Sequence, residues 1–290
     1  MGGANVMWSR IRTYASFVRV SHSVFALPFA LVGALLAARV VGFEWWRLPW
    51  IVACMVAARS AAMGFNRLVD AAYDARNPRT AMRELPRGRM SRSEAVGFVA
   101  VASVIFIACA WKLGAVCFAL SPVALAIVFW YSLAKRVTFY TQAFLGLAMA
   151  VAPVGGWLAA GGRLGPAPWT LGLAIGTWVA GFDVLYACQD LDVDRREGLR
   201  SIPVRFGIAR SLAISRALHV VAVTALAAVG VIAALSPLYF AGVVVVAGLL
   251  IYEQSLVRAD DLSQVKRAFD LNGWVGLLYF ASTTVAVCWK

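Results

Sequence analysis

Charged side chains are scarce in this sequence of 290 residues. Asp, Glu, Lys and Arg together make up 14% of it, whereas hydrophobic residues make up 62%. A typical soluble domain has about 25% charged and about 45–50% apolar residues, so the composition excludes an ordinary soluble domain and a disordered chain. The mean hydropathy of +0.78 indicates enough apolar side chains to face lipid as well as a protein interior. The composition therefore predicts a protein that crosses the lipid bilayer several times.

Residues that form disulfides or bind soft metals are also few. Five cysteines lie in or beside apolar segments, none of them in a CxxC pair, and the two histidines are His22 and His219. An odd number of scattered cysteines excludes a secreted disulfide scaffold, and two distant histidines do not by themselves form a zinc site. We expect the cysteines to be small, buried apolar residues.

Long apolar runs, in contrast, recur along the whole chain. A helix needs about 20 mostly apolar residues to cross the hydrocarbon core of a bilayer. The alternation of a membrane β-barrel does not recur, and the first apolar run continues as a full span, so no cleavable signal peptide is evident. The sequence predicts an all-α membrane protein with nine transmembrane helices, at about 22–41, 49–72, 95–112, 114–132, 138–160, 168–187, 211–234, 237–256 and 271–288.

The net charge of +13 is explained by orientation in a membrane. Most lysines and arginines lie in alternate loops, which are cytoplasmic if the N-terminus is cytoplasmic. We therefore predict a multi-pass protein of the cytoplasmic (inner) membrane, with its C-terminus outside and no nucleic-acid partner. The two longest inside loops, at about 75–94 and 190–210, each follow an acidic helix end.

Acidic residues are concentrated in a few segments. Six of the 14 acidic residues lie there, namely Asp70, Asp74, Asp183, Asp190, Asp192 and Asp194. Asn66, Asp70 and Asp74 are spaced four residues apart, and Asp190 and Asp194 repeat this spacing. Residues four apart share one face of a helix. Each motif therefore places its oxygen side chains side by side.

Crowded carboxylates repel one another, and at bilayer depth each costs about 3 kcal/mol. A bound cation would offset this cost, and a set of oxygen ligands without His or Cys suits Mg²⁺, which commonly binds one or two carboxylates together with substrate phosphates. The alternative is that these residues are acidic helix ends paired with arginines of the loops.

Basic residues accompany both acidic segments. Lys135 and Arg136 end the fourth span, Arg79 follows the first acidic segment, and Arg200 and Ser201 follow the second. Acidic and basic groups at one membrane face are what a Mg²⁺–diphosphate site needs, because Arg and Lys bind the phosphate charge that the metal leaves. Membrane topology is an alternative reason for each loop arginine. Lys135 and Arg136 are the stronger candidates because they lie at a helix end.

Two arginines lie inside the second span. Arg59 is seven residues before Asn66 and shares its face. A buried arginine in a span is a candidate functional residue, which either holds an anionic substrate group or pairs with Asp183 or Asp70. Arg67 points away from that face, which is typical of an arginine that reaches the membrane interface.

At these residues the chain resembles the UbiA superfamily of intramembrane aromatic prenyltransferases. The similar motifs are Asn66-xxx-Asp70-xxx-Asp74, Asp190-xxx-Asp194 and residues 21–30, 131–136, 186–190 and 198–203. The longer strings resemble the 4-hydroxybenzoate polyprenyltransferase branch and its relatives that prenylate a dihydroxynaphthoate in the futalosine route to menaquinone. One departure is Glu84, which replaces the first proline of the family's Arg-Pro-Leu-Pro string.

The resemblance implies a single UbiA-type domain over residues 1–290, built as a nine-helix bundle with a central cavity under a cytoplasmic cap. It implies two Mg²⁺ sites and a diphosphate contact, formed by Asn66, Asp70 and Asp74, by Asp190 and Asp194, and by Lys135 and Arg136, respectively.

The expected activity is Mg²⁺-dependent transfer of a polyprenyl group from its diphosphate to a ring carbon of a 4-hydroxybenzoate-like acid in respiratory quinone biosynthesis. Arg59 is the candidate to hold the acceptor carboxylate, and Asp183 is the candidate to orient or deprotonate its phenol. A dihydroxynaphthoate is the alternative acceptor. An ion-coupled secondary transporter is the alternative from another class, although it predicts charges near the bilayer midplane and not at helix ends.

Overall fold

The computed structural model describes residues 10, 13–14, 16–18, 20–42 and 44–289 of the chain. The side chains of residues 20–25, which include His22, lie outside this description. The elements are α2 (Val20–Val41), α3 (Arg47–Arg76), α4 (Arg92–Leu113), α5 (Ala115–Val137), α6 (Thr141–Ala159), α7 (Pro166–Ala187), η1 (Cys188–Asp190), α8 (Leu191–Arg196), α9 (Ile202–Ile232), α10 (Pro237–Ser255) and α11 (Val265–Cys288).

The prediction of an all-α protein with several membrane spans is confirmed for the described residues. Eight of their helices are long and apolar enough to cross a bilayer. Helix α2 contributes a further apolar stretch, Ala26–Val41, within the first predicted span. Gly114 separates α4 from α5 with a φ of +130°, a conformation that glycine adopts without the steric cost of a side chain.

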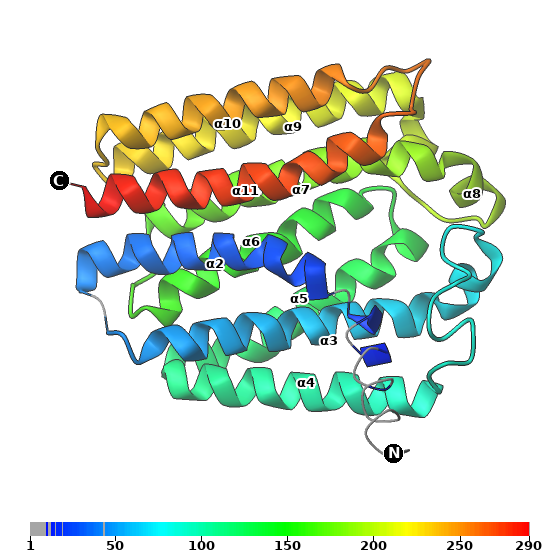
Figure 1. Cartoon of the computed structure of the whole chain (residues 1–290), viewed down its shortest axis with the longest axis horizontal. Helices are drawn as coiled ribbons and strands as arrows, with labels where there is room; N and C mark the ends of the chain where they lie inside the picture. Colours follow the sequence, from blue (N-terminus) through cyan, green and yellow to red (C-terminus); the bar gives the residue numbers. More distant parts are fainter. Residues whose placement is uncertain (1–9, 11–12, 15, 19, 43, 290) are drawn as a thin grey trace, which may run out of the picture.

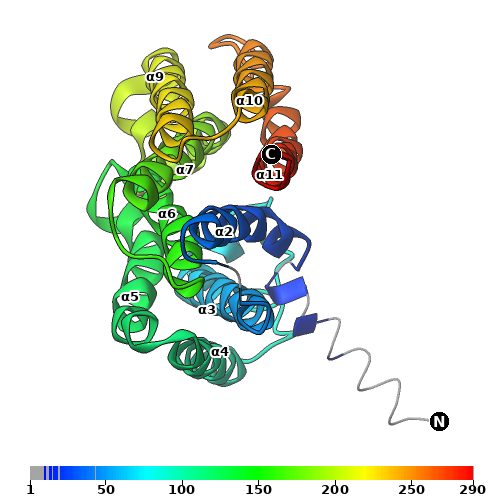
Figure 2. The ribbon, with the colours of Figure 1, turned by 90° about the vertical axis from the view of Figure 1, so that its left-hand side faces the viewer.

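The long helices lie side by side, and both acidic motifs lie at one end of the bundle (Figure 1). Viewed end-on, a curved wall runs from α4 through α5, α6 and α7 to α9 and α10, with α2, α3 and α11 on its concave side (Figure 2). Helix α2 packs on α6, and α11 packs on both α10 and α2. We call the end that carries α8 and the loop 77–91 the motif end.

Two arginines at the opposite end join the C-termini of several helices. The Arg47 guanidinium donates to the carbonyls of Leu113 (3.0 Å) and Ala159 (3.1 Å), the last residues of α4 and α6. Arg39 donates to the carbonyls of Ala233 (3.2 Å) and Ala234 (2.9 Å) after α9. The last carbonyls of a helix have no partner inside it and carry partial negative charge. Both arginines therefore stabilise the helix C-termini at the end of the bundle opposite the motif end.

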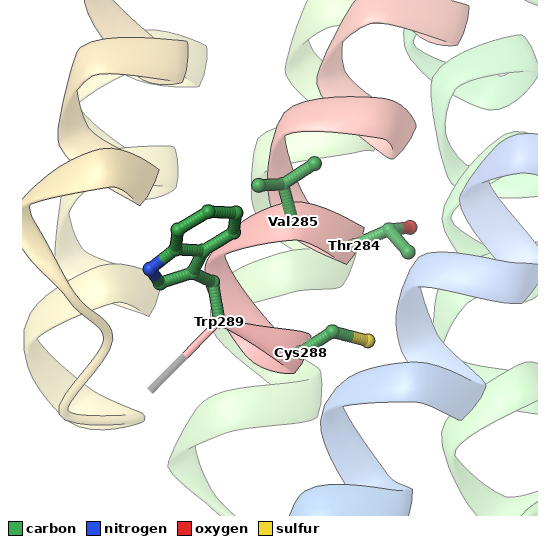
Figure 3. A pocket seen from close by; sticks show the side chains of 4 residues that line it. All are labelled: Thr284, Val285, Cys288 and Trp289. Atoms are coloured by element: carbon green, nitrogen blue, oxygen red, sulfur yellow. The ribbon is translucent and has the colours of Figure 1, made fainter.

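The cysteines only partly match the prediction that they are buried. Cys109 and Cys188 are buried and Cys54 and Cys117 partly buried, but Cys288 is exposed, and all five are free thiols. Cys288 lines a groove of about 440 Å³ at the end of α11, together with Thr284, Val285 and Trp289 (Figure 3). The prediction was wrong for Cys288 because α11 ends there, so no further turn of helix covers its thiol.

Helices α2 and α6 approach so closely that their contact has no room for a side chain. A Cβ added at Gly156 would lie 2.0 Å from the Ala30 carbonyl oxygen, and one at Gly33 would lie 2.0 Å from that of Pro153. Small residues at such crossings let the backbones of membrane helices pack directly against each other.

We predict that Gly156→Ala lowers stability by about 1–3 kcal/mol, because the added methyl group forces the two helices apart. The measurement is the unfolding temperature of the purified protein in detergent. Gly155→Ala is the matched control, since a Cβ at Gly155 would meet nothing within 4 Å. Equal unfolding temperatures for the two variants would contradict the close contact of α2 and α6.

Candidate active site

The motif end brings together three parts of the chain that are distant in sequence. The last turns of α3 carry Asn66, Asp70 and Asp74, and the loop 77–91 follows them. Helix α5 ends beside this motif, and the segment η1–α8 carries the second motif. The spacing of four residues predicts a shared helical face for the first motif, and the contacts below show what that face meets.

Asp70 is the most enclosed carboxylate of the first motif. It is 4% exposed and receives Lys135 Nζ at 2.6 Å on Oδ2 and an Arg136 guanidinium nitrogen at 2.7 Å on Oδ1. Asn66 Nδ2 donates to the same Oδ2 at 3.3 Å. Lys135 and Arg136 therefore both contact the first motif through Asp70.

The loop after α3 supplies one guanidinium to each motif. Arg83 binds both carboxylate oxygens of Asp74, at 2.8 and 2.7 Å. Arg79 binds Asp190 at 2.7 Å and donates to the Tyr186 hydroxyl at 2.8 Å. This loop thus connects the two acidic motifs.

Asp194 has a different environment. Its carboxylate accepts a hydrogen bond from Ser201 Oγ at 3.1 Å, and no basic side chain of the described residues forms an ion pair with it. Arg200 points elsewhere: its backbone N–H donates to the Lys135 carbonyl at 2.8 Å, and its guanidinium donates to the Val137 carbonyl. Arg200 therefore attaches the second loop to the end of α5.

The two motifs face the same basic groups. Lys135, which is bonded to Asp70, also lies within electrostatic range of Asp190 and Asp194. Asp183, deeper in α7, lies within range of the same two carboxylates. The two acidic motifs, which are predicted separately from the sequence, therefore share Lys135 as a neighbouring charge.

Arg59 and Asp183 lie below this constellation, within the membrane-spanning helices. Tyr131 lies within electrostatic range of Arg59, Asp70 and Asp183. Arg59 Nε is buried and has no hydrogen-bond partner among the described residues, and Arg59 forms no ion pair with Asp70 or Asp183 there. The alternative that Arg59 exists to pair with one of these carboxylates is therefore wrong for this structure.

Arg67 is not the interface residue that the sequence suggested. It is 4% exposed, and its guanidinium forms an ion pair with Glu84 at 3.2 Å. Glu84, the residue that departs from the family string, is itself 8% exposed and also accepts a hydrogen bond from Ser16 Oγ. The departure therefore introduces a buried carboxylate together with one buried partner, Arg67.

Sequence reasoning missed several groups of the site. Arg83 is one basic residue among several in its loop, so charge alone did not distinguish it. Arg76 and Glu197 form an ion pair at 2.5 Å between the two motif segments. The sequence alone does not predict this pair, because nothing in it shows that the two segments are in contact.

The donor set fits a hard divalent cation, because the motif side chains offer only carboxylate and amide oxygens. Within the described residues, however, no three acidic, histidine or cysteine side chains converge on one point. Basic side chains hold Asp70, Asp74 and Asp190 instead. The pairing of acidic helix ends with loop arginines, the alternative drawn from the sequence, is thus present in this structure.

Comparison with known proteins places this geometry in a family. The model of the UbiA prenyltransferase family matches residues 26–282. A 4-hydroxybenzoate octaprenyltransferase of Tolumonas auensis is 34% identical over 228 residues, which are 79% of each chain. One of Aliivibrio fischeri (strain MJ11) is 30% identical over 247 residues, covering 85% of this chain and 86% of that protein.

Solved structures agree. A UbiA homologue from Aeropyrum pernix K1 superposes with a TM-score of 0.83 and 34% identity, covering 91% of this chain and 98% of that one. A UbiA homologue from Archaeoglobus fulgidus bound to GPP and Mg²⁺ has the same fold, with a TM-score of 0.71, 19% identity and coverage of 95% and 99%. With its apolar helices, its paired acidic motifs and a family match over most of its length, this chain belongs to the UbiA prenyltransferase family of membrane enzymes.

Proposed function

We propose that this enzyme transfers a polyprenyl group from polyprenyl diphosphate to a ring carbon of a 4-hydroxybenzoate-like acid, in respiratory quinone biosynthesis. The observation that carries the proposal is Arg59, a partly buried arginine whose Nε is buried without a hydrogen-bond partner and which forms no ion pair within the described part of the chain, in the span below a cluster of acidic and basic groups. Such a cation suits an acceptor that brings its own carboxylate. The names of the relatives from Tolumonas auensis and Aliivibrio fischeri support this acceptor.

The motif end would hold the diphosphate. Lys135, Arg136 and Arg79 bind carboxylates there in this structure. The same side chains would donate their hydrogen bonds to phosphate oxygens once the diphosphate is bound. Ser201 and the loop of Arg200 complete this side. The residues that would hold Mg²⁺ are Asn66, Asp70 and Asp74 for one ion, and Asp190 and Asp194 for the other.

Bound Mg²⁺ would supply Lewis-acid stabilisation of the charge on the leaving diphosphate. The chain's own groups perform the remaining tasks. As the allylic C–O bond breaks, its electron pair leaves with the diphosphate, on which Lys135 and Arg136 are placed to bind the growing charge. The acceptor ring then gives a π-electron pair to the new C–C bond, and its ring proton passes to the released diphosphate, the base that the reaction itself supplies.

Arg59 would fix the acceptor by its carboxylate, so that the phenol end of the ring points toward the acids. Asp183 lies within electrostatic range of Tyr131 and of Asp190 and Asp194. We assign to Asp183 the orientation or deprotonation of the phenol, which raises the electron density of the neighbouring ring carbon. Exclusion of water by the surrounding helices would protect the allylic cation.

The membrane topology that goes with this function is as follows. The protein would form one domain over residues 1–290 with nine spans, counting α2, in the inner membrane. Its N-terminus would be cytoplasmic and its C-terminus outside. The loop 77–91 and the segment around α8 would form a cytoplasmic cap over the diphosphate above a central cavity. The bias of Lys and Arg to alternate loops supports this orientation. A transporter is not favoured, because the motif carboxylates lie at helix ends and the chain belongs to a prenyltransferase family.

Asp70→Ala and Asp190→Ala are each expected to lower turnover by at least about 100-fold, because each removes an oxygen ligand from a site that stabilises the leaving group. The measurement is prenyl transfer by protein reconstituted in lipid, with size-exclusion profiles to show that both variants still insert and fold. Asp270→Asn, which breaks only the exposed pair Lys266–Asp270, is the matched control. Wild-type turnover in either alanine variant would contradict the metal sites.

Arg59→Met is expected to raise the KM for 4-hydroxybenzoate by about 10–100-fold, the effect of losing a charge-assisted hydrogen bond. The KM for the prenyl diphosphate should change much less. Because the change removes a partly buried charge that has no ion-pair partner among the described residues, the unfolding temperature should not fall. A neutral acceptor, 4-hydroxybenzaldehyde, tests the role directly: Arg59→Met should not alter its KM. An equal rise in KM for both acceptors would contradict the carboxylate contact.

The acceptor itself is tested by offering the wild-type protein a long polyprenyl diphosphate and Mg²⁺ with either 4-hydroxybenzoate or the dihydroxynaphthoate. We expect the prenylated benzoate as the main product, identified by mass spectrometry. Preferential prenylation of the naphthoate would contradict the benzoate assignment and would place the enzyme in menaquinone synthesis.

A further inference from the structure

Two ion pairs connect the segments that carry the acidic motifs. One is Arg79–Asp190, at 2.7 Å. The other is Arg76–Glu197, in which Oε2 of Glu197 receives two guanidinium nitrogens of Arg76, at 2.5 and 2.7 Å. Arg76 is the last residue of α3, and Glu197 is the residue that follows α8.

The two ion pairs differ in whether they include a proposed ligand of Mg²⁺. Arg79–Asp190 uses a carboxylate that the proposed function assigns to Mg²⁺, so this pair must open when Asp190 takes a metal. Arg76 and Glu197 are not assigned to the metal or to the diphosphate. Their pair can therefore persist in the loaded enzyme.

Arg76 is also held in a defined direction. Its guanidinium lies 5.1 Å from the centre of the Tyr73 ring, and the Arg136 guanidinium lies 5.1 Å from the centre of the same ring. A cation near an aromatic face is attracted to it. The side chain of Glu197 is 21% accessible and that of Arg76 is 55% accessible, and the pair joins the two segments three residues after Asp194.

We propose that Arg76 and Glu197 are a positioning pair, which keeps the two halves of the diphosphate site together after Mg²⁺ and diphosphate have displaced Arg79 from Asp190. This inference rests on the proposed function. It predicts that the pair contributes to substrate affinity and not to the stability of the ligand-free protein, in which Arg79–Asp190 still joins the segments.

The test measures binding of geranyl diphosphate to the full-length protein in lipid nanodiscs, with Mg²⁺, by calorimetry. Arg76→Gln and Glu197→Gln should each weaken binding by about five-fold, which corresponds to about 1 kcal/mol. The exchanged double variant Arg76→Glu/Glu197→Arg should restore most of the affinity. In turnover assays the KM for the prenyl diphosphate should rise in the single variants, while kcat stays within about two-fold of wild type.

Asp270→Asn, which opens an exposed ion pair on α11, is the matched control and should bind as the wild type does. Unfolding temperatures without ligand should be equal for wild type and all variants. A wild-type protein that does not bind the probe overturns the proposed function, and the pair's role falls with it. Single variants that bind as tightly as Asp270→Asn overturn the positioning role alone. So does an exchanged variant without recovery, or a loss of ligand-free stability that accounts for the weaker binding.

Discussion

The arrangement of the motif end depends on one electrostatic constraint: carboxylates crowded at the ends of membrane helices must be neutralised. Asp70 meets this constraint with two cations from α5, Lys135 and Arg136, and the loop after α3 meets it for Asp74 and Asp190. Uncompensated charge in such a setting is costly. The same constraint explains why three segments that are distant in sequence meet at the motif end. It also favours binding of a metal ion together with a polyvalent anion, because the metal can replace the basic side chains on the carboxylates while the anion takes those basic side chains.

Neutralisation and ligand binding are therefore not competing interpretations of the acidic motifs. In the structure the acids hold the basic groups, and in the proposed complex the acids hold Mg²⁺ while the basic groups hold phosphate. Asp70, Asp74 and Asp190 therefore have a cationic partner in both states. Asp194 accepts a hydrogen bond from Ser201 and has no basic ion-pair partner among the described residues. It can therefore bind a cation without first losing an ion pair.

The sequence predicts the placement of those candidate residues whose position depends on regular helices. The spacing of Asn66, Asp70 and Asp74 determines a shared face, and a helix end determines where Lys135 and Arg136 can reach. It did not predict Arg83 or the pair of Arg67 with Glu84, because their partners depend on the path of an irregular loop, which no periodicity records. Arg67 was misjudged because its side chain is buried against Glu84 of the loop 77–91 and does not reach the membrane interface.

The hydrogen bond from Ser16 to Glu84 has a consequence for the segment before the first span. Phe17 is completely buried and packs in one cluster with Val18, Met90 and Ala95, so this segment supports the loop that reaches both acidic motifs. Ser16, Phe17 and Val18 therefore support the loop of the candidate active site, although none of them carries its chemistry. A chimaeric enzyme assembled from two relatives would therefore need this segment and the loop 77–91 from the same parent, since the two pack on each other.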